Sequence, residues 1–194
     1  MKKICLFLLC TILVLLFSGC HHHKQEDVIK VNGIALPEGL EFGMKEGEVT
    51  QIFGGEFSTY NDTMIYDWRS FEDNEDYPEG FSYSSYLLTV GFTEDNSFEY
   101  LCYTLEAYDD ETPYDDYYSA LEYLKKYYGE PTTHKDTWTD DRYKDDFPMW
   151  NKAVQQGHLT MYDEWAVDGY YFRLDSAADG HVSITFVRDK ANFE

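Results

Sequence analysis

The chain has 194 residues, with 37 Asp and Glu against 15 Lys and Arg, which gives a formal net charge of −22. Such an acidic surface repels phosphate groups, so the composition excludes nucleic-acid binding and attachment to anionic lipid head groups through protein charge. The length is ample for one hydrophobic core, or for two small halves that share one core.

The N-terminus has the features of an export signal. Lys2 and Lys3 precede an apolar run from Ile4 to Phe17, and small residues follow. A membrane-spanning helix needs about twenty apolar residues, so this run is too short to be one. Residues 1–19 are therefore predicted to be a secretory signal peptide.

The end of this signal, "FSGC", resembles the lipobox of bacterial lipoproteins, although Phe17 stands where those proteins more often have leucine. The resemblance implies cleavage between Gly19 and Cys20, with a diacylglyceryl group on the Cys20 sulfur. Two acyl chains, such as palmitate, hold a protein firmly on a membrane. We expect an extracytoplasmic protein attached through its N-terminal lipid; the alternative is an ordinary signal peptide with a chance cysteine.

The cysteines agree with this assignment. Cys5 and Cys10 would leave with the signal and Cys20 would carry lipid, so Cys102 alone would remain in the exported domain. A domain without a disulfide must be held together by its core. Cys102 lies in the strand-like run "SFEYLCYTLEA", where a buried, inert thiol is expected rather than a reactive one.

No metal or cofactor site is predicted. Residues 20–27 form a polar tether that includes His21–His23. Imidazole is a common metal ligand, but consecutive histidines on a flexible tail seldom form a preorganised site. His134, His158 and His181 are scattered, with no Cys or second His at ligand spacing.

A first helix is predicted in "LEFGMKEGEVTQIFGGEF". Val49, Ile52 and Phe53 fall on one helical face, and Gly54 suits the left-handed residue that ends a helix. Gly47 weakens the interior, so the helix should be short. The segment "VIKVNGIAL" before it contains Asn32-Gly33, a tight-turn signal. The segments "TMIYDWR", "SSYLLTVGF" and "SFEYLCYTLEA" after it are predicted strands.

A second helix is predicted in "YYSALEYLKKYYGEP", ending at Gly129. Its apolar face consists of Tyr117, Leu121, Leu124 and Tyr128. The segment "DDFPMWNKAVQQG" is predicted to be an inserted helix, with Asp146 as its cap, Pro148 in its first turn and Gly157 after its end.

The strands "HLTMYDEW", "YYFRLDS" and "HVSITFVRD" follow, with Asp168-Gly169 and Asp179-Gly180 at hairpin-compatible connections. The order of helix, glycine and three strands therefore occurs twice. We predict an α+β domain over residues 28–194, with repeat one at about 28–108 and repeat two at about 113–190. The two degenerate repeats should form a largely antiparallel sheet with helices packed on it.

The segment "FGMKEGEVTQIFGGEF" resembles the opening helix of SmpA/OmlA outer-membrane-assembly lipoproteins and is similar to the repeats of β-lactamase-inhibitor proteins. The matching positions are Gly43, Met44, Val49, Phe53 and Gly54, and Lys45 stands where those families usually have a hydroxyl residue that caps the helix. The resemblance implies a binding module rather than an enzyme.

Motifs for catalysis are missing from the sequence. There is no Gly-x-Ser-x-Gly elbow, His-Glu-x-x-His or phosphate-binding glycine loop, and the acidic loops lack calcium-loop spacing. Paired carboxylates, as a glycosidase needs, arise by chance among 37 acidic residues. We therefore expect a non-catalytic protein.

The aromatic content is high, with 18 Tyr, 13 Phe and 4 Trp. These rings either fill the faces of the sheet or line a recognition surface, because Tyr and Trp are favoured at interfaces. The expected function is a lipid-anchored binding module for another envelope protein. The alternative is a glycan-binding surface lipoprotein, and an enzyme is the least favoured class.

Overall fold

The computed structural model describes residues 34–54, 58–61, 64–70, 83–107, 112–177 and 180–193. The predicted signal peptide, Cys20, the tether and the Asn32-Gly33 turn lie outside these residues. None of the helices among the described residues is both long and apolar enough to cross a membrane.

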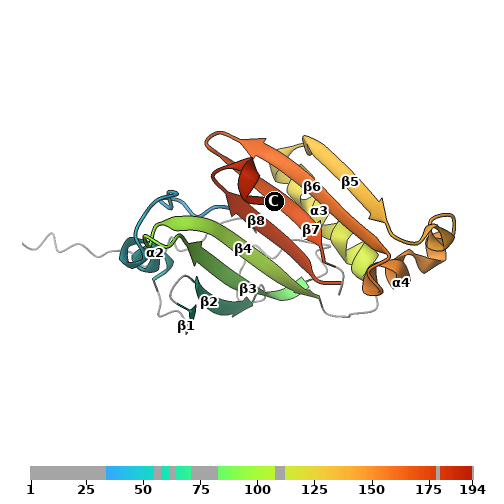
Figure 1. Cartoon of the computed structure of the whole chain (residues 1–194), viewed down its shortest axis with the longest axis horizontal. Helices are drawn as coiled ribbons and strands as arrows, with labels where there is room; N and C mark the ends of the chain where they lie inside the picture. Colours follow the sequence, from blue (N-terminus) through green and yellow to red (C-terminus); the bar gives the residue numbers. More distant parts are fainter. Residues whose placement is uncertain are drawn as a thin grey trace, which may run out of the picture.

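One antiparallel sheet of eight strands dominates the structure (Figure 1), in the order β1-β2-β3-β4-β8-β7-β6-β5. The first meander comprises β1 (Ser58–Asn61), β2 (Met64–Ser70), β3 (Tyr83–Phe92) and β4 (Phe98–Ala107). The second comprises β5 (Thr133–Trp138), β6 (Leu159–Val167), β7 (Tyr170–Ser176) and β8 (Val182–Val187). The two meanders join where β4 pairs with β8.

Each meander is preceded by a helix, α2 (Glu46–Phe53) or α3 (Pro113–Tyr128). This arrangement confirms the predicted α+β class with two helix-then-strands repeats. Within the described residues each repeat nevertheless has four strands where the sequence predicted three, because β1 and β5 were missed. The four central residues of β5 are all exposed, so this strand at the edge of the sheet shows no apolar alternation.

The first helix ends as predicted but begins differently from the resembled families. Gly54 has φ 66° and ψ 15°, the left-handed conformation that favours glycine. At the start, the Glu48 carboxylate accepts a hydrogen bond from the Lys45 backbone N–H at 2.9 Å. The Lys45 ammonium can only donate hydrogen bonds, so it cannot cap the helix as a hydroxyl would. It donates to the Asp95 carbonyl and the Ser97 hydroxyl, each at 2.8 Å. Lys45 thus ties α2 to the β3–β4 turn.

The second helix covers one face of the sheet. It begins at Pro113, one turn before the predicted Tyr117, since proline suits a first turn. It packs over β7 and β8 (Figure 1) and ends at Gly129, where φ is 76° and ψ is −168°. The Trp165 indole N–H donates to the Gly129 carbonyl at 2.9 Å, which fastens this end of the helix to β6.

The predicted inserted helix is present as α4 (Trp150–Gln155), preceded by the 3-10 turns η1 (Asp141–Tyr143) and η2 (Phe147–Met149). Asp146 precedes η2, but its side chain makes no capping hydrogen bond, while Pro148 lies in the first turn of η2 as expected. The Asn151 amide oxygen accepts from the Tyr114 N–H at 2.8 Å. This bond fixes α4 against the start of α3.

The hydrophobic core lies between the helices and one face of the sheet. Strand register places its members in rows across the sheet, and α3 adds Tyr117, Leu121 and Leu124. One row runs Val90, Leu101, Phe186, Phe172 and Trp165, and the next runs Leu88, Tyr103, Ile184, Leu174 and Asp163. All of these residues are buried. We call this side the helix-covered face.

Candidate functional site: the helix-free face of the sheet

Alternate residues of the same strands form the opposite surface, which we call the helix-free face. Strand register places Tyr100, Val187 and Tyr171 in one row across β4, β8 and β7. The adjoining rows are Cys102, Thr185, Arg173 and Glu164, and then Thr104, Ser183, Asp175 and Tyr162. Hydroxyl and charged groups are therefore frequent on this face, whereas the rows of the helix-covered face are mostly apolar.

The Tyr100 ring lies across the backbone of β3. A Cβ added at Gly91 would collide with the Tyr100 ring, so a larger residue there would displace the ring. Gly91 is the register partner of Tyr100. A glycine in a strand interior often marks such a close approach. The Tyr100 ring therefore packs on the sheet at Gly91, and Tyr100 is half-buried.

A depression of about 380 Å³ opens beside this ring. It is lined by Glu99, Tyr100, Thr185, Val187 and Asn192, from β4, β8 and the C-terminal segment. Val187 is only 1% exposed, although it lies on the helix-free face. The lining of the depression therefore combines the Tyr100 ring with polar groups, as binding sites commonly do.

Arg173 organises the neighbouring part of the face. Its Nε donates to Asp175 Oδ2 at 2.9 Å, and its Nη1 lies 3.6 Å from Glu164 Oε1. The guanidinium also lies over the rings of Tyr162 and Phe193, at 5.2 and 4.5 Å from their centroids. Burial raises the pKa of Asp175, and Arg173 partly offsets that rise. The arginine is thus engaged within the protein.

The C-terminal turn η3 (Lys190–Phe193) folds onto this face (Figure 1). Arg173 Nη2 donates to the Phe193 carbonyl at 3.1 Å, and Lys190 Nζ donates to Glu164 Oε2 at 2.5 Å. Glu164 is consequently only 5% exposed, and its hydrogen bond raises the pKa of Lys190. The turn is therefore bonded to β6 and β7, and its Asn192 borders the depression beside Tyr100.

Cys102 lies in the middle of the helix-free face. Its sulfur accepts a hydrogen bond from the Thr185 hydroxyl at 3.4 Å. Burial raises the pKa of the Cys102 thiol, which disfavours the reactive thiolate. The raised pKa agrees with the predicted inert thiol, but Cys102 is half-buried on the helix-free face and not fully buried as predicted.

A polar network crosses the helix-covered face. The Tyr117 hydroxyl donates to Asp163 Oδ2 at 2.6 Å, and His134 Nδ1 lies 3.0 Å from Asp163 Oδ1. A histidine oriented by a buried carboxylate occurs in nucleophilic active sites. Here, however, His134 Nε2 lies 3.5 Å from the Asp136 carboxylate, which occupies the place where a nucleophile would stand. The network joins α3 to β6 and β5 and presents no activated nucleophile.

The other predicted features fall at scattered places. Among the described residues, no group of three His, Cys, Asp or Glu side chains could hold a metal ion. His158 stacks on Tyr143, and His181 precedes β8, far in the chain from His134. The acidic segment 71–80 and the N-terminal histidines lie outside the described residues.

The sequence did not single out the residues of the helix-free face. Tyr171, Arg173 and Asp175 alternate with the apolar Phe172 and Leu174, and this period-two pattern was available in "YYFRLDS". The sequence did not show which strands are neighbours in the sheet, because the two meanders join through the β4–β8 pairing.

No protein-family model matches the chain, and neither the curated proteins nor the solved structures that were searched contain a match. The resemblance to outer-membrane-assembly lipoproteins and β-lactamase-inhibitor proteins therefore stays a prediction.

Proposed function

We propose that this protein is a lipid-anchored, extracytoplasmic binding module, without catalytic activity, that holds another envelope protein on the helix-free face of its sheet. The observation that carries the proposal is the row of Tyr100, Val187 and Tyr171 beside an open depression. Tyrosine supplies a large apolar area with a polar tip, and it is enriched among the residues that dominate protein interfaces.

Charge defines the kind of partner. The full chain has a net charge of −22, and loss of Lys2 and Lys3 with the signal peptide would make it still more acidic. The protein should therefore attract a partner with a basic surface and repel other acidic proteins. Complementary charge mainly raises the association rate, which falls as salt screens the attraction. Binding to the partner should therefore weaken with increasing ionic strength.

The anchor is tested separately from the binding face. Cys20→Ala should leave the protein unprocessed or in the soluble fraction, while the parent protein partitions into detergent. Intact-mass analysis of the parent protein should show residues 1–19 removed and a diacylglyceryl group added at Cys20. A mass that retains residues 1–19 without lipid would exclude the anchor.

The binding face is tested by site-specific photocrosslinking in intact cells of the source organism. A benzophenone amino acid replaces Tyr171 on the helix-free face, and in the control it replaces Tyr127, which is 43% exposed on α3. We expect a discrete protein adduct from position 171 that is reduced at high salt, and none from position 127. Equal adducts from both positions, or none from either, would contradict the proposal.

The alternative, glycan binding, has its own structural support. Phe147 is 62% exposed, and it packs edge-on against Trp150 and Tyr114, with ring centroids 5.0 and 6.0 Å away. Exposed aromatic rings are surfaces on which sugars stack. The test is retention of the protein on cell-wall polysaccharide. Retention that does not depend on salt and is lost in Phe147→Ala would favour glycan binding over a protein partner.

A further inference from the structure

The depression beside Tyr100 is lined by an acidic residue that an irregularity of β4 brings to this side of the sheet. β3 and β4 pair through Gly91 and Tyr100 and then through Phe92 and Phe98, so Glu99 is an extra residue without a register partner. A bulge of this kind changes the direction in which a side chain points. In a regular strand Glu99 would face away from Tyr100, but here both residues line the same depression.

The charge of Glu99 is not balanced by a cation in the described part of the chain. None of the ion pairs among the described residues involves Glu99. The described lining of the depression contains no lysine or arginine. On the neighbouring part of the face, Arg173 and Lys190 are already bonded to Asp175 and Glu164. The depression therefore combines a negative charge with a tyrosine ring.

The neighbouring part of the same face shows which cation such a combination holds. Arg173 lies over two aromatic rings, at 5.2 and 4.5 Å from their centroids, and its Nε donates to Asp175 Oδ2 at 2.9 Å. A ring beside a carboxylate suits arginine, because the planar guanidinium stacks on the ring while its N–H groups donate to oxygen. Tyr100 and Glu99 offer the same two groups in the depression.

The other polar residues of the lining can accept hydrogen bonds from a guanidinium, which has five N–H donors. The Thr185 hydroxyl donates its hydrogen to the Cys102 sulfur at 3.4 Å, so its oxygen keeps lone pairs for another donor. Asn192 is exposed, and its side-chain amide carries a further oxygen acceptor. The lining thus supplies acceptors around the charge of Glu99.

We propose that the depression beside Tyr100 receives an arginine side chain of the envelope protein, with its guanidinium on the Tyr100 ring and bonded to Glu99. This inference rests on the proposed function, and it names the chemical group by which the partner is recognised. Lysine fits less well, because its ammonium is a compact, strongly hydrated charge that lacks the planar fork of arginine.

The first test is an NMR titration of the purified full chain with N-acetyl-L-argininamide hydrochloride at neutral pH. N-acetyl-L-citrullinamide, in which an uncharged urea replaces the guanidinium, is the matched control compound. We expect the arginine compound to bind about tenfold more tightly, which corresponds to about 1.4 kcal/mol. The amide signals of Tyr100, Thr185 and Val187 should shift most. Equal affinities for the two compounds would overturn the proposal.

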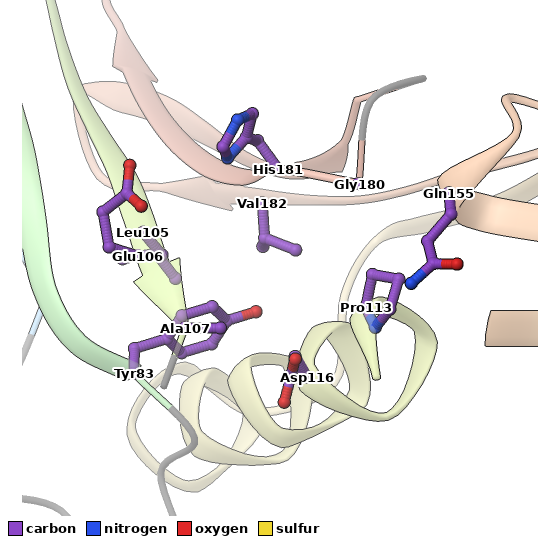
Figure 2. A pocket seen from close by; sticks show the side chains of 10 residues that line it. All are labelled: Tyr83, Leu105, Glu106, Ala107, Pro113, Asp116, Gln155, Gly180, His181 and Val182. Atoms are coloured by element: carbon purple, nitrogen blue, oxygen red, sulfur yellow. The ribbon is translucent and has the colours of Figure 1, made fainter. Parts of the chain in front are cut away.

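A second cavity of the protein provides an internal control for the location of binding. It has a volume of about 260 Å³ and lies at the end of β4 and the start of β8, beside the first turn of α3 (Figure 2). It shares no lining residue with the depression. The amide signals of His181 and Val182, which line this cavity, should not change. Shifts that cluster at these two residues would contradict the proposed site.

Matched variants identify the charge that is responsible. Glu99→Gln should remove the preference for the arginine compound without changing the affinity for the citrulline compound. Glu94→Gln makes the same change in net charge at an exposed position of the β3–β4 turn, and it should keep the preference. A preference that survives in Glu99→Gln would place the guanidinium elsewhere and would contradict the assignment.

A variant of the ring tests the site even if Glu99→Gln disturbs the bulge. Tyr100→Leu keeps an apolar side chain but removes the aromatic face, so the arginine compound should bind about threefold more weakly or worse. Unchanged affinity in a folded Tyr100→Leu protein would exclude stacking of the guanidinium on this ring.

The partner itself is tested by combining these variants with the benzophenone amino acid at position 171 in cells. Glu99→Gln should lower the yield of the protein adduct several-fold, whereas Glu94→Gln should leave it unchanged. An equal yield in Glu99→Gln would overturn the arginine contact and leave the envelope partner in place. No adduct in the parent protein would contradict the proposed function, whereas failure of the argininamide titration would contradict this inference alone.

Discussion

On β7, Phe172 and Leu174 are fully buried on the helix-covered face, whereas Tyr171, Arg173 and Asp175 lie on the helix-free face and are only half-buried. The strand is the same, and only the direction of the side chain differs. Apolar burial, which supplies most of the stability, is therefore concentrated on one face. Half-buried side chains of the other face, such as Tyr171, can change with less effect on folding, which is the property a recognition surface needs.

The largest difference between the faces should appear in paired truncations on β7. Phe172→Ala should lower the free energy of unfolding by about 3–5 kcal/mol, because a buried ring is lost and a cavity remains. Tyr171→Ala should lower it by less than about 1 kcal/mol, as surface substitutions do. Urea denaturation measures both variants. Similar losses in the two variants would mean that the faces share the stabilising role.

The polar network of the helix-covered face should contribute the next largest effect. Tyr117→Phe removes the hydroxyl that donates to Asp163 at 2.6 Å, and Asp163 is only 1% exposed. A buried carboxylate that loses a donor costs about 1–3 kcal/mol.

Tyr127→Phe is the matched control, because Tyr127 lies on the same helix and is 43% exposed. Its free energy of unfolding should stay within about 0.5 kcal/mol of the parent value. If Tyr117→Phe lowers the free energy of unfolding no more than Tyr127→Phe does, water replaces the missing donor to Asp163.

The sequence predicted the helix-covered face better than the helix-free face, and the reason is physical. Apolar periodicity and end signals identified α3, Gly54, Gly129 and the insertion that contains α4, because burial and backbone sterics act locally on those residues. The strand β5 was missed because its exposed residues "HKDT" have no apolar pattern.

The pairing of strands that are distant in the chain could not be predicted from the sequence. Tyr100 and Tyr171 are 71 positions apart in the numbering, yet both flank Val187 through the pairing of β4 and β7 with β8. This arrangement leaves no local pattern, so the helix-free face could not be predicted residue by residue.

The end of the sheet-covering α3 should give a smaller effect on stability than Phe172→Ala and Tyr117→Phe. The helix ends at Gly129, from which the chain turns toward β5. Gly129 has φ 76° with no atom within 4 Å of an added Cβ, so the backbone conformation alone disfavours other residues. Gly129→Val should cost about 1–2 kcal/mol.

Gly47→Ala in α2 is the opposite control. Gly47 lies inside the helix, has no positive φ and has open space around it. Alanine there should stabilise the protein by about 0.5–1 kcal/mol, because it favours the helix and restricts the unfolded chain. Thermal unfolding compares the two variants, and a stabilising Gly129→Val would contradict the strained helix end.

The smallest expected effect concerns the pH dependence contributed by the helix-free face. Burial raises the pKa of Asp175 in the folded protein, although Arg173 opposes that rise. Because the folded pKa exceeds the unfolded value of about 3.9, the folded state favours the protonated carboxyl. The stability contributed by Asp175 is therefore fully present below about pH 3.9 and is lost as the pH rises through the higher folded pKa.

Asp175→Asn keeps an acceptor for Arg173 Nε but has no proton to release. The free energy of unfolding of the parent protein, relative to this variant, should therefore fall as the pH rises above about 4 and then level off. We expect a total change below about 1 kcal/mol, in keeping with the half-exposed position of the residue. Urea titrations at closely spaced pH values measure it. A relative stability that instead rises with pH would mean that the attraction to Arg173 outweighs burial, and that this part of the helix-free face is held together by charge.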